Sequence, residues 1–177
     1  SLTGKDFLAI AAFGIAISFK LQAAFIAPFL FLLVLKGKIR WWLFFIVPVI
    51  YVISLIPAWV AGRPFDELFL IYLDQADFYH RITKNAPNLY QWLDNSYYEI
   101  FVRMGLLLTT GLVVLGIFVV LESRMPINRE TIIILATISV SVVPYFLPKM
   151  HERYFFPADV LAIVYAFYFP KYFYVPI

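Results

Sequence analysis

Long runs of apolar residues without charge constrain this chain more than any other feature. Residues from Met104 to Leu121 include no charged side chain, and the same holds from Leu43 to Ala61 and from Thr131 to Leu147. A helix of ~20 apolar residues crosses the hydrocarbon core of a bilayer. Only 14% of the chain is charged, whereas soluble domains carry about 25%, so lipid must cover much of its surface. The sequence therefore predicts an all-α, polytopic transmembrane helical bundle.

The first apolar stretch, from Phe7 to Leu35, is interrupted by Lys20 and Gln22 and allows two interpretations. As one span, it places Lys20 near the bilayer centre, which costs several kcal/mol. As two short helices folded back at Lys20, it lets the ammonium reach the far interface, and we favour this hairpin. With a last apolar stretch from Phe155 to about Phe169, the count is six crossings, or five if the first stretch is a single span.

One long polar segment, from about residue 62 to 103, is expected to form an external loop. Apolar side chains between Phe65 and Tyr79 recur at helical spacing, with acidic residues on the other side. This pattern predicts an amphipathic helix that lies on the membrane or packs against other external parts. Asp74 and Asp77 could share a face of this helix and bind a cation, but a solvated acidic face is the simpler interpretation.

Loop charges predict which side of the membrane faces the cytoplasm. Lysines and arginines lie in the short loops at 36–40 and 122–130 and near Lys171, and short loops that concentrate such residues face the cytoplasm. Both histidines and most acidic residues fall on or near the other side: Asp66, Glu67, Asp74, Asp77, His80, Asp94, Glu99, His151, Glu152 and Asp159. Groups able to do acid–base chemistry therefore gather on the extracytoplasmic or lumenal side.

Several classes of function find no support in the sequence. Cysteine is absent, which excludes disulfides and thiolate metal sites. The net charge of +3 is scattered, so we expect the bilayer as a partner and no nucleic acid. A Gly-rich phosphate loop, an H-E-x-x-H motif and a nucleophile elbow are all missing. We predict no metal site, and a divalent cation cofactor has no specific support.

Residues 1–177 are interpreted as a single transmembrane domain. The chain opens Ser1-Leu2-Thr3-Gly4 and runs directly into apolar sequence. It has no initiator Met and no signal-peptide pattern. We therefore expect a piece of a longer protein.

The loop Pro148 to Tyr154 is the densest polar cluster near the predicted membrane spans. Lys149 and Arg153 are four residues apart, so in a helix they would share a face and could hold one phosphate between them. His151 beside Glu152 can hold a proton near neutral pH. The alternative is a solvated turn that anchors two helix ends.

A second cluster, from Asn85 to Trp92, mixes amides with aromatic rings. Amides hydrogen-bond sugars and rings stack on them, so five side chains could line an acceptor site: Asn85, Asn88, Tyr90, Gln91 and Trp92. The alternative is a capped loop with an interfacial Trp. Lys20 also allows two interpretations. It is either a point charge that binds a lipid phosphate or a lysine that snorkels to an interface.

Three segments resemble motifs of polytopic glycosyltransferases. Ile17 to Gln22, continuing through Pro28, is similar to a helix pair with Lys-x-Gln followed by Pro. Asn85 to Trp92 resembles an external-loop motif, and Pro148 to Pro157, which contains His-Glu-Arg-Tyr, resembles a late-loop motif. Together they resemble bacterial membrane proteins related to the GPI mannosyltransferase II family, within the GT-C superfamily.

The resemblance implies a GT-C-like fold and a mannosyltransferase-like enzyme. The donor would be a polyprenyl- or dolichyl-phosphate sugar, used on the extracytoplasmic side. Lys20, Lys149 and Arg153 would bind the donor phosphate, and His151 and Glu152 would have a catalytic role. The carboxylate that acts as general base in GT-C enzymes should lie upstream of Ser1, so this chain is expected to be the C-terminal part of the enzyme.

Two other classes of function remain open from the sequence. One is a transporter in which Lys20, His151 and Glu152 form an ion or proton path, although no internal repeat of the kind common in transporters is present. The other is a non-catalytic membrane subunit that holds partners together. A polyprenyl-linked ligase or polymerase is a nearby enzymatic variant.

Overall fold

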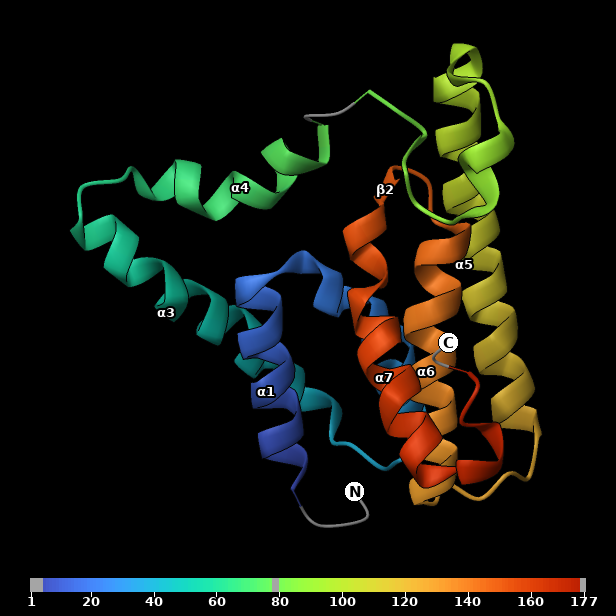
Figure 1. Ribbon diagram of the computed structural model, residues 1–177. Helices are drawn as coiled ribbons and strands as arrows, with labels where there is room; N and C mark the ends of the chain where they lie inside the picture. The colour runs from blue at the N-terminus through green and yellow to red at the C-terminus, as the bar shows by residue number, and fades with distance from the viewer. Residues whose placement is uncertain (1–4, 78–79, 176–177) are drawn as a thin grey trace. The chain divides into compact units, whose positions relative to one another are not determined.

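The computed structural model describes residues 5–77 and 80–175, and these residues are mostly helical, as predicted (Figure 1). The chain divides into two compact units. The first unit comprises Ser1–Ala24 and Gly37–His80, and the second comprises Phe25–Lys36 and Arg81–Ile177. The all-α prediction needs one correction within the described residues, because the second unit contains a pair of two-residue strands.

The first unit is built on the close packing of α1 (Asp6–Phe19) against α3 (Ile46–Val60), which follows the short 3-10 helix Trp41–Phe45. A Cβ atom at Gly14 would lie 3.0 Å from Ile50 Cδ1 and 3.4 Å from Val47 Cα. A larger side chain at Gly14 would therefore push the two helices apart.

The predicted amphipathic helix is present as α4 (Phe65–Asp77). Two tyrosine hydroxyls hold it in the first unit: Tyr51 donates to the carbonyl of Phe69 at 3.2 Å, and Tyr72 donates to the carbonyl of Ile17 at 2.9 Å. The side chains of Asp74 and Asp77, for which the sequence allows a cation site, lie outside the described residues.

The first apolar stretch is broken at Lys20. Helix α1 ends at Phe19, and Lys20 has an extended backbone with φ −154°. A 3-10 helix (Leu21–Ile26) and α2 (Ala27–Leu35) follow. The stretch is thus not one continuous helix, and it has the two short arms that the hairpin interpretation requires. Helix α1 belongs to the first unit and α2 to the second.

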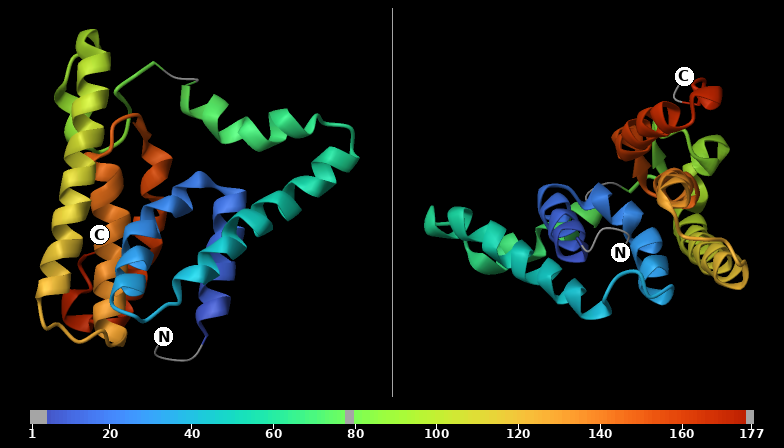
Figure 2. Two further views of the ribbon diagram at one scale, coloured as in Figure 1. Left: turned by 180° about the vertical axis from the view of Figure 1, so that it is seen from behind. Right: turned by 90° about the horizontal axis from the view of Figure 1, so that it is seen from below.

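In its described residues, the second unit contains four α-helices: α2, α5 (Tyr98–Glu122), α6 (Arg129–Phe146) and α7 (Phe156–Tyr168). Helices α5, α6 and α7 lie side by side in Figure 1, and the view from behind in Figure 2 shows α2 alongside α5 and α6. The Ser139 hydroxyl on α6 donates to the carbonyl of Phe25 at 2.7 Å. A buried cluster around Phe25 and Val140 forms the core at this level.

Hydrogen bonds identify the two ends of the second unit. Lys36, at the end of α2, donates from Nζ to the carbonyls of Leu121 at 3.1 Å and Ser123 at 3.2 Å. These carbonyls have no partner within α5, so the lysine satisfies them. At the other end, Thr109 on α5 donates to the carbonyl of Phe146, the last residue of α6. Helices α2 and α5 are therefore parallel to each other, and α6 runs antiparallel to both.

Among the described residues, three helices are long and apolar enough to cross a bilayer: Trp41–Val60, Asn95–Glu122 and Arg129–Phe146. They coincide with three predicted spans and indicate a membrane-embedded protein. Helices α1 and α7 have 14 and 13 residues, which is short of the ~20 needed to span. The count of six crossings and the GT-C-like fold remain predictions.

Candidate functional site

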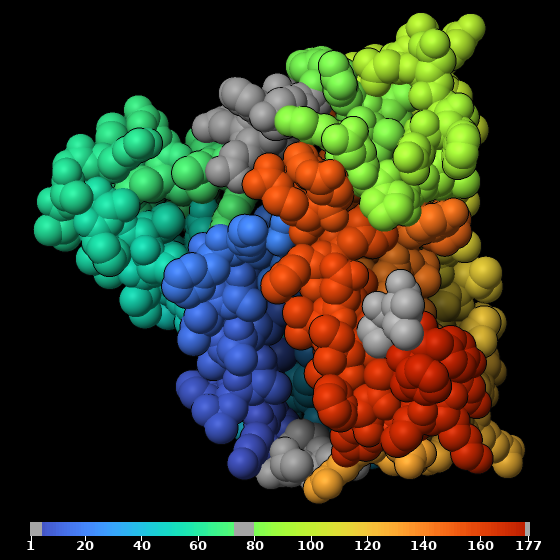
Figure 3. Space-filling view, viewed as in Figure 1, coloured from blue at the N-terminus to red at the C-terminus, as the bar shows by residue number. Residues whose placement is uncertain are grey.

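A short parallel strand pair joins two segments that are far apart in the sequence. Strand β1 (Thr83–Lys84) pairs with β2 (Met150–His151), with Thr83 opposite Met150 and Lys84 opposite His151. The Lys149 amide donates to the carbonyl of Ile82 at 2.6 Å and extends the ladder. Figure 3 shows the segment after residue 80 in bright green against the orange α6–α7 connection. The pairing brings together the two polar segments that the sequence singled out in this unit.

Buried residues on each segment explain why the strands pair at this register. Ala86 has no exposed surface and Met150 is 7% exposed, and both pack with Phe25 and Val140. Successive side chains of a strand point to opposite faces. Burial of Met150 therefore turns the neighbouring His151 to the other face of the strand, where its side chain is 16% exposed.

Backbone strain is concentrated beside the strand pair. Asn85 has φ +55° and Lys149 has φ +62°, and they are the two non-glycine residues with positive φ in the described chain. Asn tolerates this conformation, but for most L-residues it costs roughly 1–2 kcal/mol. Retained strain of this kind clusters at functional sites, so Lys149 marks the loop as a candidate.

His151 lies between a cation and a carboxylate. Its Nδ1 accepts the Arg153 backbone N–H at 3.4 Å and lies 3.9 Å from Glu152 Oε1, while its Nε2 lies 3.5 Å from Arg153 Nη2. A proton on Nδ1 faces Glu152 and leaves Nε2 to accept from Arg153. A proton on Nε2 leaves Nδ1 to accept the backbone N–H. The neutral ring thus has a partner in either tautomer.

Lys149 and Arg153 do not share a helix face. Lys149 precedes β2, and Arg153 lies in the 3-10 helix Glu152–Phe155 that follows it. The sequence prediction assumed a helical spacing, which the strand pairing overrides. The Lys149 ammonium instead lies 5.9 Å from the ring centroid of Tyr98 at the start of α5, a cation–π distance. Joint phosphate binding by the two residues remains a prediction.

The predicted acceptor segment divides into buried and exposed side chains. Asn88 and Tyr90 are each 3% exposed, and the Asn88 Oδ1 accepts the Tyr90 N–H at 3.2 Å, which caps the 3-10 helix Leu89–Trp92. The Tyr90 hydroxyl donates to the carbonyl of Phe146 at 2.7 Å, and burial raises its pKa. Asn88 and Tyr90 therefore build the turn. Asn85, Gln91 and Trp92 are exposed and free to meet a ligand.

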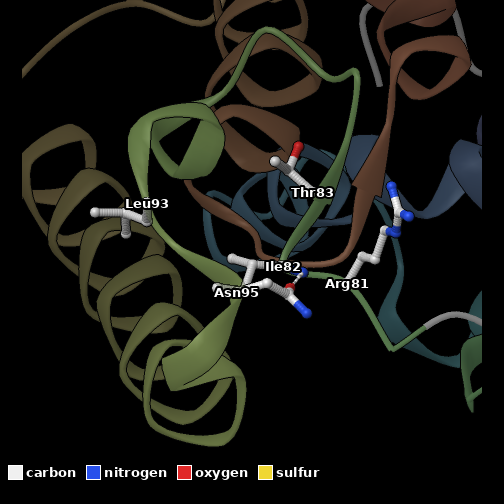
Figure 4. A pocket seen from close by; sticks show the side chains of 5 residues that line it. All are labelled: Arg81, Ile82, Thr83, Leu93 and Asn95. Atoms are coloured by element: carbon white, nitrogen blue, oxygen red, sulfur yellow. Dashed lines mark hydrogen bonds between the residues drawn. The ribbon is translucent and has the colours of Figure 1, made fainter.

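A cavity of about 270 Å³ opens beside β1, and the sequence analysis missed it. Its lining, drawn in Figure 4, comprises Arg81, Ile82, Thr83, Leu93 and Asn95. The Ile82 N–H donates to Asn95 Oδ1 at 2.9 Å, which closes the segment into a loop. In Figure 4, Arg81 and Leu93 lie at opposite sides of the cavity. These residues flank Asn85–Trp92 on both sides, and the hydrogen bond that closes the loop cannot be read from the sequence.

Charge around this cavity is mixed. Arg81 is the charged residue in the lining. Hydrogen bonds from the Ser96 hydroxyl and N–H hold the pKa of nearby Asp94 below its usual range, so that carboxylate is ionised at neutral pH. Across the part of the chain that the structure describes, no group of three or more His, Asp or Glu side chains is placed to hold a metal ion.

Lys20 belongs to the first unit, where its backbone N–H closes α1 on the carbonyl of Ala16 and its side chain is exposed. Its proximity to Arg153 and His151 remains a prediction. Of the three segments that carry the family resemblance, the strand pair brings two side by side, namely Asn85–Trp92, which follows β1, and Pro148–Pro157, which contains β2. Comparison of the chain with known protein families, curated proteins and solved structures finds no match.

Proposed function

We propose that this chain is part of a membrane glycosyltransferase, mannosyltransferase-like in its chemistry. It moves a sugar from a polyprenyl- or dolichyl-phosphate donor to an acceptor on the extracytoplasmic side. The observation that carries the proposal is the pairing of β1 with β2. The pairing joins two polar segments of the resemblance at one end of apolar helices, where a lipid-linked donor can be reached from the bilayer.

The proposed reaction is a displacement at the anomeric carbon of the donor sugar. A base removes the proton of an acceptor hydroxyl, and the oxygen attacks that carbon. The bond to the phosphate oxygen breaks, and its electron pair leaves with the lipid phosphate. Lys149 and Arg153 stabilise the negative charge on that phosphate as it develops. The base itself is not assigned to a residue of this chain.

His151 and Glu152 assist rather than replace that base. Glu152 lies 3.9 Å from the His151 ring, and Arg153 flanks its other nitrogen at 3.5 Å. The ring can therefore hold Arg153 toward the phosphate, or exchange a proton with Glu152, whereas Arg153 stays protonated throughout. Both roles need the neutral imidazole.

The cavity beside β1 offers room for part of the acceptor. Its 270 Å³ lies just below the ~300–1,000 Å³ of pockets for drug-sized ligands, which suits one polar group rather than a whole glycan. Arg81 and Asn95 provide polar walls and Leu93 an apolar one. Exposed Asn85 and Gln91 in the adjoining segment add amides of the kind that hydrogen-bond sugars.

The test uses the full-length protein in vesicles, with radiolabelled polyprenyl-phosphate mannose as donor and a total membrane lipid extract as acceptor. Arg153→Ala should lower kcat about 100-fold, because a group that stabilises developing charge is lost. His151→Ala should lower it by a similar factor through loss of orientation or relay.

Arg124→Ala is the matched control, because Arg124 is an exposed arginine between α5 and α6, at the other end of the second unit. It should leave turnover unchanged. Wild-type turnover in both the Arg153 and His151 variants would refute the proposed site. Mannose transfer that is absent from the wild-type protein under all donor conditions would refute the transferase itself.

A further inference from the structure

The depth of the site relative to the bilayer can be inferred from α5. This helix has 25 residues, but its charge-free part runs from Met104 to Leu121, after Glu99 and Arg103. At 1.5 Å per residue that part is about 27 Å long, close to the ~30 Å thickness of the hydrocarbon core. The boundary between hydrocarbon and headgroups therefore falls near Arg103 and Met104.

Tyr90 fixes the height of the 3-10 turn Leu89–Trp92 against this boundary. A Cβ atom at Gly105 would collide with the Tyr90 hydroxyl, so the phenol lies directly against the helix there. The same hydroxyl donates to the carbonyl of Phe146, which also accepts from Thr109. Gly105 is adjacent to the boundary residue Met104, so the turn lies at headgroup depth and not far out in water.

The turn presents large apolar side chains outward at this height. Trp92 is 89% exposed, and its neighbours Leu89 and Leu93 are 39% and 38% exposed. Tyr97, at the entry to α5, is 61% exposed. Trp and Tyr are enriched where a membrane meets water, because they combine an apolar body with a polar N–H or O–H.

A lipid-facing stripe on α5 starts where the turn ends. Met104, Leu107 and Val114 are 61%, 74% and 60% exposed and follow one another at helical spacing. The opposite side of the helix carries Gly105 and Thr109, which are buried against protein. The exposed side chains of the turn therefore lie just above the apolar face of α5 that contacts lipid.

We propose that Trp92, flanked by Leu89 and Leu93, inserts into the interfacial layer of the bilayer and anchors the turn there. The occupant of this surface is the lipid headgroup region, not a stacked sugar. Because β1 (Thr83–Lys84) lies just before this turn in the chain, the anchor holds the strand pair at the depth of lipid phosphates. The inference stands without the proposed transferase, since it concerns only where the turn lies.

Fluorescence of a single tryptophan tests this anchor. Trp41, Trp42 and Trp59 are each replaced by Phe, which leaves Trp92 alone among the four tryptophans. The full chain is reconstituted in phosphatidylcholine vesicles with bromine near the headgroup end or near the methyl end of the acyl chains. Bromine near the headgroup should quench Trp92 strongly, bromine near the methyl end weakly, and aqueous acrylamide much less than it quenches free N-acetyltryptophanamide.

Val114→Trp in a chain whose four native tryptophans are replaced by Phe gives the deep reference, because Val114 is exposed near the midpoint of the charge-free part of α5. It should respond most to bromine near the methyl end. If Trp92 is quenched by acrylamide as freely as the free amide and ignores both lipids, the anchor does not exist. Should the triple substitution misfold, the difference between wild-type protein and Trp92→Phe alone gives the same comparison.

Discussion

At the scale of single residues, Lys149 is the position where local preference and tertiary structure conflict most clearly. Its φ of +62° is unfavourable for a side chain with a Cβ atom. It persists because the preceding Pro148 is buried, the Lys149 amide donates to the Ile82 carbonyl, and Met150 is held in the core. The backbone strain is therefore located at Lys149, whose side chain also places a positive charge in the site.

Lys149→Gly should raise stability relative to Lys149→Ala by about 1 kcal/mol, because only the glycine removes the Cβ strain. Both variants lose the ammonium near Tyr98, so their difference isolates the backbone. Thermal unfolding in detergent micelles measures it. Equal stability of the two variants would show that the left-handed backbone at this position carries no strain.

Polar segments were predictable from the sequence at this scale, but the direction of each side chain was not. Asn85, Asn88, Tyr90, Gln91 and Trp92 looked equivalent as possible sugar ligands. Asn88 and Tyr90 turn inward because one caps the turn and the other reaches the Phe146 carbonyl. That carbonyl lies 56 positions away in the chain, so no local pattern reveals it.

At the scale of elements, periodicity identified the helices and missed the strands. Apolar repeats over many residues predicted α4 and the three helices that could span a membrane, and the structure has them. Strands β1 and β2 have two residues each, too few for an alternating pattern to stand out. The pairing also overrides the helical spacing assumed for Lys149 and Arg153.

A cysteine pair placed across the strands tests the register. The chain has no cysteine of its own, so Thr83→Cys with Met150→Cys introduces the only two thiols. Opposed positions of neighbouring strands lie within the Cα separation that a disulfide allows. Mild oxidation should therefore remove both free thiols, as counted by maleimide labelling after unfolding.

Lys84→Cys with Met150→Cys is the control, because a shift of one position points the Cβ atom to the other face of the strand. It should cross-link more slowly. Equal or faster cross-linking of this pair would contradict the register of Thr83 opposite Met150.

At the scale of the whole molecule, apolar length predicted a membrane protein, and the three long helices agree. Composition could not decide how many helices cross. Helices α1 and α7 are too short to span alone, and whether a short helix crosses depends on its packing and on how thick the lipid is around it. Neither the packing of a short helix nor the thickness of the surrounding lipid can be predicted from a short stretch of sequence.

Orientation can be tested with single cysteines at the two ends of the second unit. Glu152→Cys lies beside the strand pair and Arg124→Cys in the α5–α6 connection, and both native side chains are exposed. If basic short loops are cytoplasmic, a membrane-impermeant maleimide should label Glu152→Cys on intact cells. It should label Arg124→Cys only after permeabilisation.

The unsubstituted chain is the blank for this labelling, because it has no thiol. Labelling of Arg124→Cys alone on intact cells would place the site on the cytoplasmic side. That result would exclude a lumenal or extracytoplasmic donor for the proposed reaction.

The parallel course of α2 and α5, tied together by Lys36, has an electrostatic consequence. Helices α2, α5 and α7 begin at the strand-pair end of the second unit, and α6 is the one α-helix of its described residues that ends there. Each helix start carries roughly half a positive elementary charge from its aligned peptide dipoles. Three helix N-termini and one helix C-terminus together leave a net positive charge from the backbone dipoles beside the site. An anion bound there would keep part of its stabilisation even after every lysine and arginine around it had been replaced.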